Sequence, residues 1–419
     1  MSAFLSSYRV LDISDHRGIL AARMMADLGA DVIHVEPPGG SPARRIGRLD
    51  SDGTSFLWKT YAAGRRSVVM DIADKQDRAA FINLVKTAHF LFDSMPVGQL
   101  EQYNLDFSTL SRENPQLVQT SITPFGSTGP KAHYQDTEIV MWAAGGALFG
   151  TRDDNLPPVR VSVPQAYLHA ASDAAVGAMI AHFGRLTTGL GQHVEISVQQ
   201  SVAQATLSTI LSDTVGDTFF QTELAATVMA ASVDKIDLSG SGSATKRSKS
   251  WNVKDGVVEL HLAMGPGTGR FTNALFNWIR ETGDCDPDIA TWDWTSIHQR
   301  IQDGEITTDD MERARGIVAR FLARYTREEL VQQSIIRKIL IAPRMRIDDV
   351  ALNPHYRARG IFQTIGHGSE ARTIVGAPGH MTLDGFGRLS PAPSLGQHNE
   401  EVLSPLFQSA HPQNTGEVS

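Results

Sequence analysis

Residues 8–40 read YRVLDISDHRGILAARMMADLGADVIHVEPPGG, and this stretch decides the fold that the sequence predicts. Tyr8–Ile13 is a short apolar run of strand type. In Ile19–Leu28 the large apolar residues recur at helical spacing, and Gly29 ends the pattern. Asp31–Val35 is a second apolar run that leads into a loop rich in proline and glycine. A strand, a helix and a strand of these lengths predict a βαβ unit with two parallel strands.

The same alternation continues through the first half of the chain. Further strand patterns occur at Ser67–Asp71, Phe90–Asp93, Leu117–Ile122 and His193–Val198, and they return at Ile361–Ile365 and Thr373–Val375. Helical patterns occur between them, at Lys75–Ala88, Gln99–Glu113, Glu138–Leu148 and Ala170–Phe183. We therefore predict an α/β protein with a mostly parallel sheet. The length of 419 residues favours two domains, and residues 238–249, which are rich in Ser, Gly and Lys, are typical of a linker.

Composition and charge exclude several classes of function. The chain is 41% hydrophobic and 20% charged, as globular enzymes are, and its net charge of -8 argues against binding to nucleic acid or to an anionic membrane. One cysteine excludes an internal disulfide and fits a reducing compartment. The sequence shows no signal-type start and no run of about 18 apolar residues, so we expect a cytoplasmic protein.

Motifs that hold cofactors are not evident. The first strand is followed by Ser14–Gly18, which lacks the glycine spacing of a dinucleotide site. The Gly265–Gly269 segment has the spacing of neither a P-loop nor a Rossmann turn, and we interpret it as a plain turn. The 14 histidines show no spacing typical of a metal site, so we predict none. The residues alone indicate an α/β protein of enzyme type.

Six blocks, in order along nearly the whole chain, resemble the family III CoA-transferases, the group of formyl-CoA transferase and carnitine CoA-transferase. They are Val10–Ile13 with Met24–Gly40, Gly64–Asp71, Asn114–Val118 with Ser121–Pro130, Thr188–Ser197, Asn353–Gly360 and Ala392–Leu403. The resemblance implies a Rossmann-like large domain formed by residues 1–215 and 340–419, and a smaller α+β domain at residues 225–335. It also implies an interlocked dimer.

The resemblance places a different residue where the family carries its nucleophile. In the family, an aspartate ends a V-P-x-A-D segment and attacks the acyl-CoA thioester, and a carboxylate suits this chemistry because its anhydride passes the acyl group on. Here the segment is Val163–Tyr167, so Tyr167 stands at the aspartate's position. A phenol cannot replace the carboxylate in this sequence of steps. The alternative is a relocated nucleophile, and the nearest acids are Glu138 and Asp173.

The resemblance also identifies losses at the CoA site. Pro37, Ala73, Ser94 and Gln102 stand where the family has residues that help to hold CoA, several of them basic. Arginine is suited to bidentate phosphate contacts, so the combined loss predicts a chain that binds no CoA itself. CoA and succinyl-CoA would then be substrates of a complex.

The pattern is similar to the aspartate-lacking subunit of the heteromeric benzylsuccinate CoA-transferases. It implies a silent subunit that pairs with a homologous, aspartate-bearing subunit and moves CoA from succinyl-CoA to a carboxylic acid such as benzylsuccinate. The alternatives are a self-sufficient homodimeric transferase or racemase-like enzyme that uses Glu138 or another acid, and a scaffold without catalysis. The candidate pocket comprises His16, Arg17, Arg44, Glu138 and Tyr167, in which the cations would hold the acid.

Overall fold

The computed structural model describes residues 2–148, 159–206, 249–368, 371–376, 379, 381–383 and 385–409. The chain divides into two compact units. Unit 1 comprises residues 1–211 and 354–419, and unit 2 comprises residues 212–353. Of the predicted linker at residues 238–249, all but Lys249 lies outside the described residues.

Unit 1 is built on a six-stranded sheet, which confirms the predicted α/β class. Its strand order is β3-β2-β1-β4-β5-β6, and every neighbouring pair is parallel. The sheet begins in the centre and grows outward in both directions, so its order reverses between β1 and β4, as in Rossmann-like folds. The strands are β1 (Arg9–Asp12), β2 (Asp31–Glu36), β3 (Arg65–Val69), β4 (Phe90–Asp93), β5 (Val118–Thr123) and β6 (His193–Ser197).

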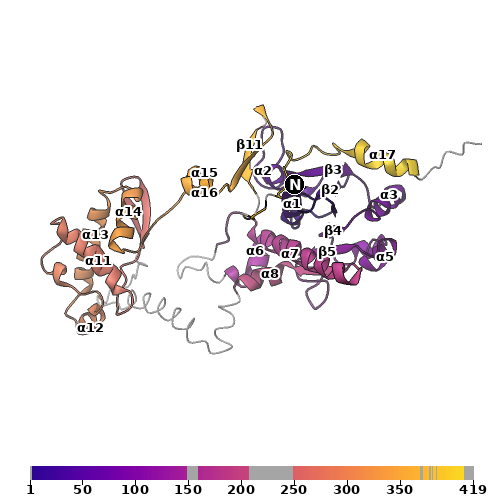
Figure 1. Cartoon of the computed structure of the whole chain (residues 1–419). Helices are drawn as coiled ribbons and strands as arrows, with labels where there is room; N and C mark the ends of the chain where they lie inside the picture. Colours follow the sequence, from indigo (N-terminus) through magenta and orange to yellow (C-terminus); the bar gives the residue numbers. More distant parts are fainter. Residues whose placement is uncertain are drawn as a thin grey trace, which may run out of the picture. The chain divides into compact units, whose positions relative to one another are not determined.

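Helices cover both faces of this sheet (Figure 1). One face presents Val10, Val32 and Phe92 to a core that includes α1 (Ile19–Asp27) and α7 (Gln165–Thr188). Successive strand residues point to opposite faces, so Leu11, Ile33 and Leu91 enter a second core. That core includes α3 (Lys75–Val85), α5 (Phe107–Glu113) and α17 (Asn399–Ser409). Both faces are therefore buried, as a parallel sheet requires.

Shorter elements complete unit 1. The segment Gln99–Glu113, predicted to be helical, forms α4 and α5 with a break between them. The hairpin formed by β10 and β11 is antiparallel and agrees with the strand patterns predicted there. These elements are α2 (Phe56–Tyr61), α4 (Gln99–Gln102), α6 (Glu138–Ala144), α8 (Val198–Ala205), α16 (Pro354–Ala358), β10 (Phe362–Ile365) and β11 (Arg372–Val375).

Unit 2 combines a three-stranded antiparallel sheet, in the order β7-β8-β9, with helices. Its core contains several tryptophans, and the Gly265–Gly269 turn packs against one of them: a Cβ at Gly269 would lie 2.2 Å from the backbone oxygen of Trp294. The elements are β7 (Ser250–Val253), β8 (Gly256–Leu260), α11 (Gly269–Glu281), α12 (Ile297–Gln302), α13 (Thr308–Leu322), α14 (Arg327–Arg337), β9 (Ile341–Pro343) and α15 (Ile347–Leu352).

Among the described residues, no helix has the length and hydropathy to cross a bilayer, and no three or more His, Cys, Asp or Glu side chains are grouped so that they could hold a metal ion. The interlocked dimer implied by the resemblance stays a prediction.

A buried charge network fixes the carboxyl end of β1. The Asp12 side chain is fully buried and contacts Arg65 on β3 and His34 on β2, the latter at 3.0 Å. Its other oxygen accepts a 2.9 Å hydrogen bond from the backbone nitrogen of Ser14. Burial by itself would raise the pKa of Asp12, but His34 and Arg65 lower it below its usual value. The carboxylate therefore stabilises the fold above about pH 4, and this contribution is lost as the pH falls through the lowered pKa.

We predict that Asp12→Asn destabilises unit 1 by about 3–5 kcal/mol, because it leaves the Arg65 guanidinium buried without its counter-charge. Hydrogen exchange of peptides covering β1 and β3, with thermal unfolding, measures the effect. The matched control is Asp52→Asn, which removes an exposed ion pair with Lys59 and is expected to cost less than about 1 kcal/mol. Equal effects of the two substitutions would contradict the structural role of Asp12.

Candidate active site

Two loops meet at the carboxyl ends of β1 and β4, where the strand order reverses. Asp15 follows β1 and Ser94 follows β4 directly. The backbone nitrogen of Asp15 donates to Ser94 Oγ at 2.8 Å, and Ser94 Oγ donates to Asp15 Oδ1 at 2.9 Å. Arg17 Nη1 adds a 3.2 Å hydrogen bond to the Ser94 carbonyl. Open α/β sheets bind their ligands at this reversal point, so the position itself identifies a candidate site.

Tyr167 lies in the first turn of α7 and faces this site. Its side chain is 4% exposed, and its hydroxyl donates to Asp136 Oδ2 at 2.8 Å. The His16 ring meets the Tyr167 ring edge to face, with 5.0 Å between the centroids. Burial, and then the hydrogen bond to Asp136, raises the pKa of Tyr167 above its usual value. The residue is therefore a neutral phenol that already uses its proton in a hydrogen bond.

Arg17 lies between two carboxylates. Its Nη2 is 3.4 Å from Asp15 Oδ2, and its Nε is 3.7 Å from Asp136 Oδ2. His16 Nδ1 lies 3.7 Å from the same Asp15 oxygen. Burial lowers the pKa of His16, although Asp15 acts in the opposite direction. His16 is thus neutral near pH 7, and the positive charge at this place is that of Arg17.

Glu138 supports the helix that carries Tyr167. It is the first residue of α6, and its Oε1 accepts hydrogen bonds from the backbone nitrogen of Ala166 at 2.8 Å and from Trp142 Nε1 at 2.9 Å. The first of these bonds satisfies a backbone donor at the start of α7. Within the described part of the chain, Glu138 Oε2 is buried without a hydrogen-bond partner. Glu138 is therefore a group that caps α7 through one carboxylate oxygen, while its other oxygen is buried without a hydrogen bond.

Arg44 has its contacts at the end of β2. Its Nε and Nη2 bind the two carboxylate oxygens of Glu36 at 2.6 and 2.7 Å, and the guanidinium lies over the Trp58 ring at 4.0 Å. Nη2 also donates to the carbonyl oxygen of Pro393 at 3.2 Å. The structure thus brings four of the five predicted pocket residues together, whereas Arg44 joins the packing between β2 and the C-terminal segment.

The four positions predicted to have lost CoA contacts carry no charge. Pro37 and Gln102 are exposed, and both hydrogen bonds of the Ser94 hydroxyl engage Asp15. The backbone nitrogen of Ala73 donates to Asp71 Oδ1 at 3.0 Å. The structure therefore shows what occupies these positions, and their relation to CoA stays a prediction.

Sequence reasoning missed two members of the site, Asp15 and Asp136. Asp15 lies in the loop that follows a predicted strand. Ligands of open α/β sheets bind at the carboxyl ends of the strands, so this position could have indicated Asp15 as a site residue. Asp136 lies two residues before Glu138 in a segment without periodicity. Its contact with Tyr167 spans 31 residues, and no local pattern indicates it.

Comparisons with known proteins agree with the sequence blocks. The BbsE subunit of succinyl-CoA:(R)-benzylsuccinate CoA-transferase from Thauera aromatica is 30% identical, over 96% of this chain and 94% of the relative. Succinyl-CoA–D-citramalate CoA-transferase from Chloroflexus aurantiacus is 24% identical, over 96% of this chain and 94% of its own length. The crystal structure of a CAIB/BAIF family protein from Brucella suis superimposes with a TM-score of 0.75 at 21% identity, covering 97% of this chain and all of that one.

The model of the family described as "CoA-transferase family III" matches residues 5–399, which is nearly the full span of the six blocks. The match confirms the predicted resemblance, and the chain belongs to CoA-transferase family III.

Proposed function

We propose that this chain is the catalytically silent subunit of a heteromeric CoA-transferase that moves CoA from succinyl-CoA to a carboxylic acid such as benzylsuccinate. One observation carries the proposal: the position of the family's nucleophilic aspartate is occupied by Tyr167, whose hydroxyl is bound to Asp136. The catalytic aspartate would come from a homologous subunit.

The chemistry of Tyr167 supports a silent site. A phenol attacks a thioester effectively only as its phenolate, and a tyrosine whose pKa is raised stays protonated at neutral pH. Its proton lies in a hydrogen bond to a carboxylate, which further stabilises the neutral phenol. Even as a phenolate, Tyr167 would form an aryl ester rather than the mixed anhydride on which CoA exchange depends.

The substrate class is supported by the relatives. BbsE bears the name of a subunit of a succinyl-CoA-dependent transferase, and the Chloroflexus aurantiacus relative is also named for succinyl-CoA. A carboxylic acid acceptor follows from the reaction class. Benzylsuccinate is the acceptor in the name of one relative at 30% identity, so it is proposed as an example of the acid.

A second candidate, a self-sufficient transferase, is favoured by one observation. Asp136 Oδ2 lies 2.8 Å from the Tyr167 hydroxyl, so a carboxylate is present beside the position of the family aspartate. Glu138 is a weaker choice, because one of its oxygens caps α7. Asp136 is the first residue to test if the isolated chain is active.

We predict that the purified chain alone transfers no CoA from succinyl-CoA to benzylsuccinate or succinate. Exchange of labelled succinate into succinyl-CoA measures the activity, and a homologue carrying the V-P-x-A-D aspartate is the positive control. Activity of the isolated chain that is abolished by Asp136→Asn or Glu138→Gln would instead establish the second candidate.

We predict that Tyr167→Asp restores no robust exchange. The new carboxylate would lie near Asp136, and a nearby like charge raises the pKa of a carboxyl group. The CoA phosphates would also lack charged partners at Pro37, Ala73 and Gln102, each worth roughly 1.5–3 kcal/mol. Isothermal titration with CoA and the exchange assay measure both effects. The matched variant adds Pro37→Arg and Gln102→Arg; robust exchange by Tyr167→Asp alone would show that the chain still binds CoA.

We predict that the chain forms a stable complex with a homologous, aspartate-bearing subunit and that this partner binds the CoA. Co-expression, gel filtration and CoA titration of the complex test it. In the complex, replacing the partner's aspartate by alanine is expected to abolish exchange. Tyr167→Phe in this chain is expected to change exchange less than about tenfold, since Tyr167 is proposed to take no part in the transfer and the substitution removes only its hydrogen bond to Asp136. A chain that binds CoA alone and ignores the homologue would contradict the proposal, and a partnered but inactive complex would favour a scaffold.

A further inference from the structure

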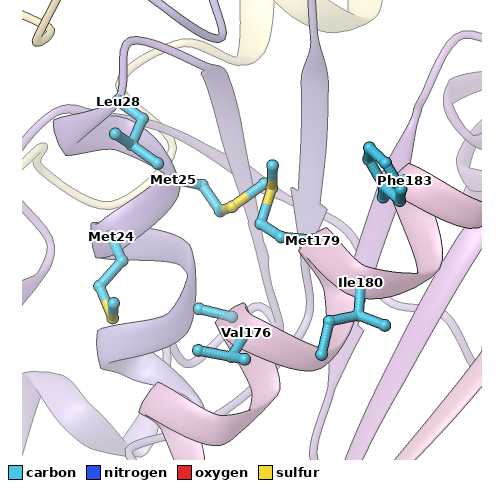
Figure 2. A pocket seen from close by; sticks show the side chains of 8 residues that line it. Met24, Met25, Leu28, Val176, Met179, Ile180 and Phe183 are labelled. Atoms are coloured by element: carbon cyan, nitrogen blue, oxygen red, sulfur yellow. The ribbon is translucent and has the colours of Figure 1, made fainter.

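One face of the large sheet carries three polar side chains in a row across β4, β5 and β6. Asp93 ends β4, Ser121 lies beside it in the register of β5, and His193 begins β6. Leu91, two residues before Asp93, belongs to the core that includes α5, so the row lies on the α5 face. On the opposite face, by contrast, the groove between α1 and α7 is lined by apolar side chains (Figure 2).

The three polar side chains are joined by hydrogen bonds. Ser121 Oγ donates to Asp93 Oδ2 at 2.7 Å and lies 2.9 Å from His193 Nε2. Because a hydroxyl has one proton, Ser121 accepts from His193 while it donates to Asp93. In a nucleophilic triad the histidine stands in the middle and takes the proton of the serine. Here the serine stands in the middle, and this order favours proton transfer over nucleophilic attack.

Exposure to solvent decreases along this series of hydrogen bonds. His193 is exposed, and its ring stacks on the ring of Phe107 in α5, with 5.7 Å between the centroids. Ser121 is half-buried, and Asp93 is 2% exposed. The hydrogen bonds therefore connect a surface imidazole with a carboxyl group that has almost no contact with solvent.

The surroundings of Asp93 favour a neutral carboxyl group. Its side-chain partners are two uncharged groups, Ser121 and Gln119, and Gln119 Nε2 donates to Asp93 Oδ2 at 3.2 Å. Burial raises the pKa of Asp93 above its usual value, although Ser121, Gln119 and His193 act in the opposite direction. Asp93 therefore takes up a proton at a pH where exposed aspartates are still ionised.

We propose that His193, Ser121 and Asp93 form a proton relay between solvent and the interior of unit 1. In the uptake step, protonated His193 gives its Nε2 proton to Ser121 Oγ, while Ser121 gives its hydroxyl proton to Asp93 Oδ2. One N–H and one O–H bond break, and two O–H bonds form. The step leaves a neutral histidine, an unchanged serine and a carboxylic acid, and proton release follows the reverse path.

Two other acids lie beside the relay, and both have partners of their own. Glu195, the next residue on this face of β6, accepts hydrogen bonds from the backbone nitrogen and the hydroxyl of Ser127. Asp106, directly before α5, accepts from two hydroxyl groups in the first turn of that helix. Neither acid is bonded to the relay, so His193 is the titratable group through which Asp93 reaches solvent.

The buried end of the relay adjoins the candidate active site. Ser94 follows Asp93 directly, its hydroxyl binds Asp15, and its carbonyl oxygen accepts from Arg17. The backbone of Met95 also bonds to the Asp93 side chain, and a carboxylate accepts such a bond more strongly than a carboxylic acid does. As the pH falls through the raised pKa of Asp93, the attachment of this loop therefore weakens.

The relay belongs to the fold of this chain, so it can succeed or fail whether or not the proposed function holds. None of the measurements that test it uses CoA.

Infrared spectroscopy of the purified full chain tests the relay, because a protonated carboxyl group has a carbonyl stretch that a carboxylate lacks. The wild-type chain is expected to show this band at a pH where exposed acids are ionised, and Asp93→Asn is expected to lose it. After a laser-induced pH jump, Ser121→Ala is expected to slow protonation of Asp93 at least tenfold. Ser121→Thr keeps a hydroxyl and is expected to retain the wild-type rate.

The surface end of the relay has its own variant. His193→Phe keeps a ring beside Phe107 but removes the titratable nitrogen, and it is expected to slow protonation as much as Ser121→Ala does. The matched control is His133→Phe, at an exposed histidine elsewhere in unit 1, which is expected to retain the wild-type rate. Thermal unfolding checks that each variant is folded.

Hydrogen exchange of residues 13–18 and 94–98, corrected for its intrinsic pH dependence, measures the attachment of the loop. The wild-type chain is expected to lose protection there as Asp93 is protonated, whereas Asp93→Asn is expected to show the same low protection at every pH. Absence of the Asp93 band, a wild-type rate in Ser121→Ala, or equal slowing in His133→Phe and His193→Phe would overturn the proposal.

Discussion

The Asp12 carboxylate, buried at the carboxyl end of the central strand, is the constraint on which the rest of unit 1 depends. Arg65 reaches it from β3 and His34 from β2, so one charge joins three adjacent strands. Arg65 also donates to the carbonyl of Ile19 at the start of α1. Because Ser14 binds the same carboxylate, both ends of the loop that carries Asp15 and Arg17 are fixed. The buried network around Asp12 therefore fixes the geometry of the candidate site.

A second constraint brings Tyr167 to this loop. The alanine face of α7 allows the helix to lie close to the sheet, and Glu138 satisfies the backbone nitrogen of Ala166 at its first turn. The residue after Ala166 is thereby held at the place where the loops of β1 and β4 meet. Any side chain at position 167 would face the same site, so the residue at this position can change without altering the fold.

The sequence predicted the parts of this structure that depend on local patterns. Short apolar runs, separated by helical patterns, indicated the strands of the sheet, because a strand that is buried on both faces is mostly apolar along its length. Contacts between distant segments were not predictable in this way. Arg44 was expected to face the acid, but its Nε and Nη2 bind the two carboxylate oxygens of Glu36 instead. Asp136 was not predicted as a site residue, because its partner Tyr167 belongs to another element and no local pattern connects them.

The electrostatics of the site follow from these placements. Asp15 and Asp136 flank a single guanidinium, that of Arg17, while His16 is kept neutral by burial. A cation enclosed by carboxyl groups is weakly available to a further anion, since binding one would break existing contacts and bring like charges together in a poorly solvated place. The hydrogen-bonded phenol of Tyr167 and the paired guanidinium of Arg17 thus share one property. In both cases the groups of the site bind one another.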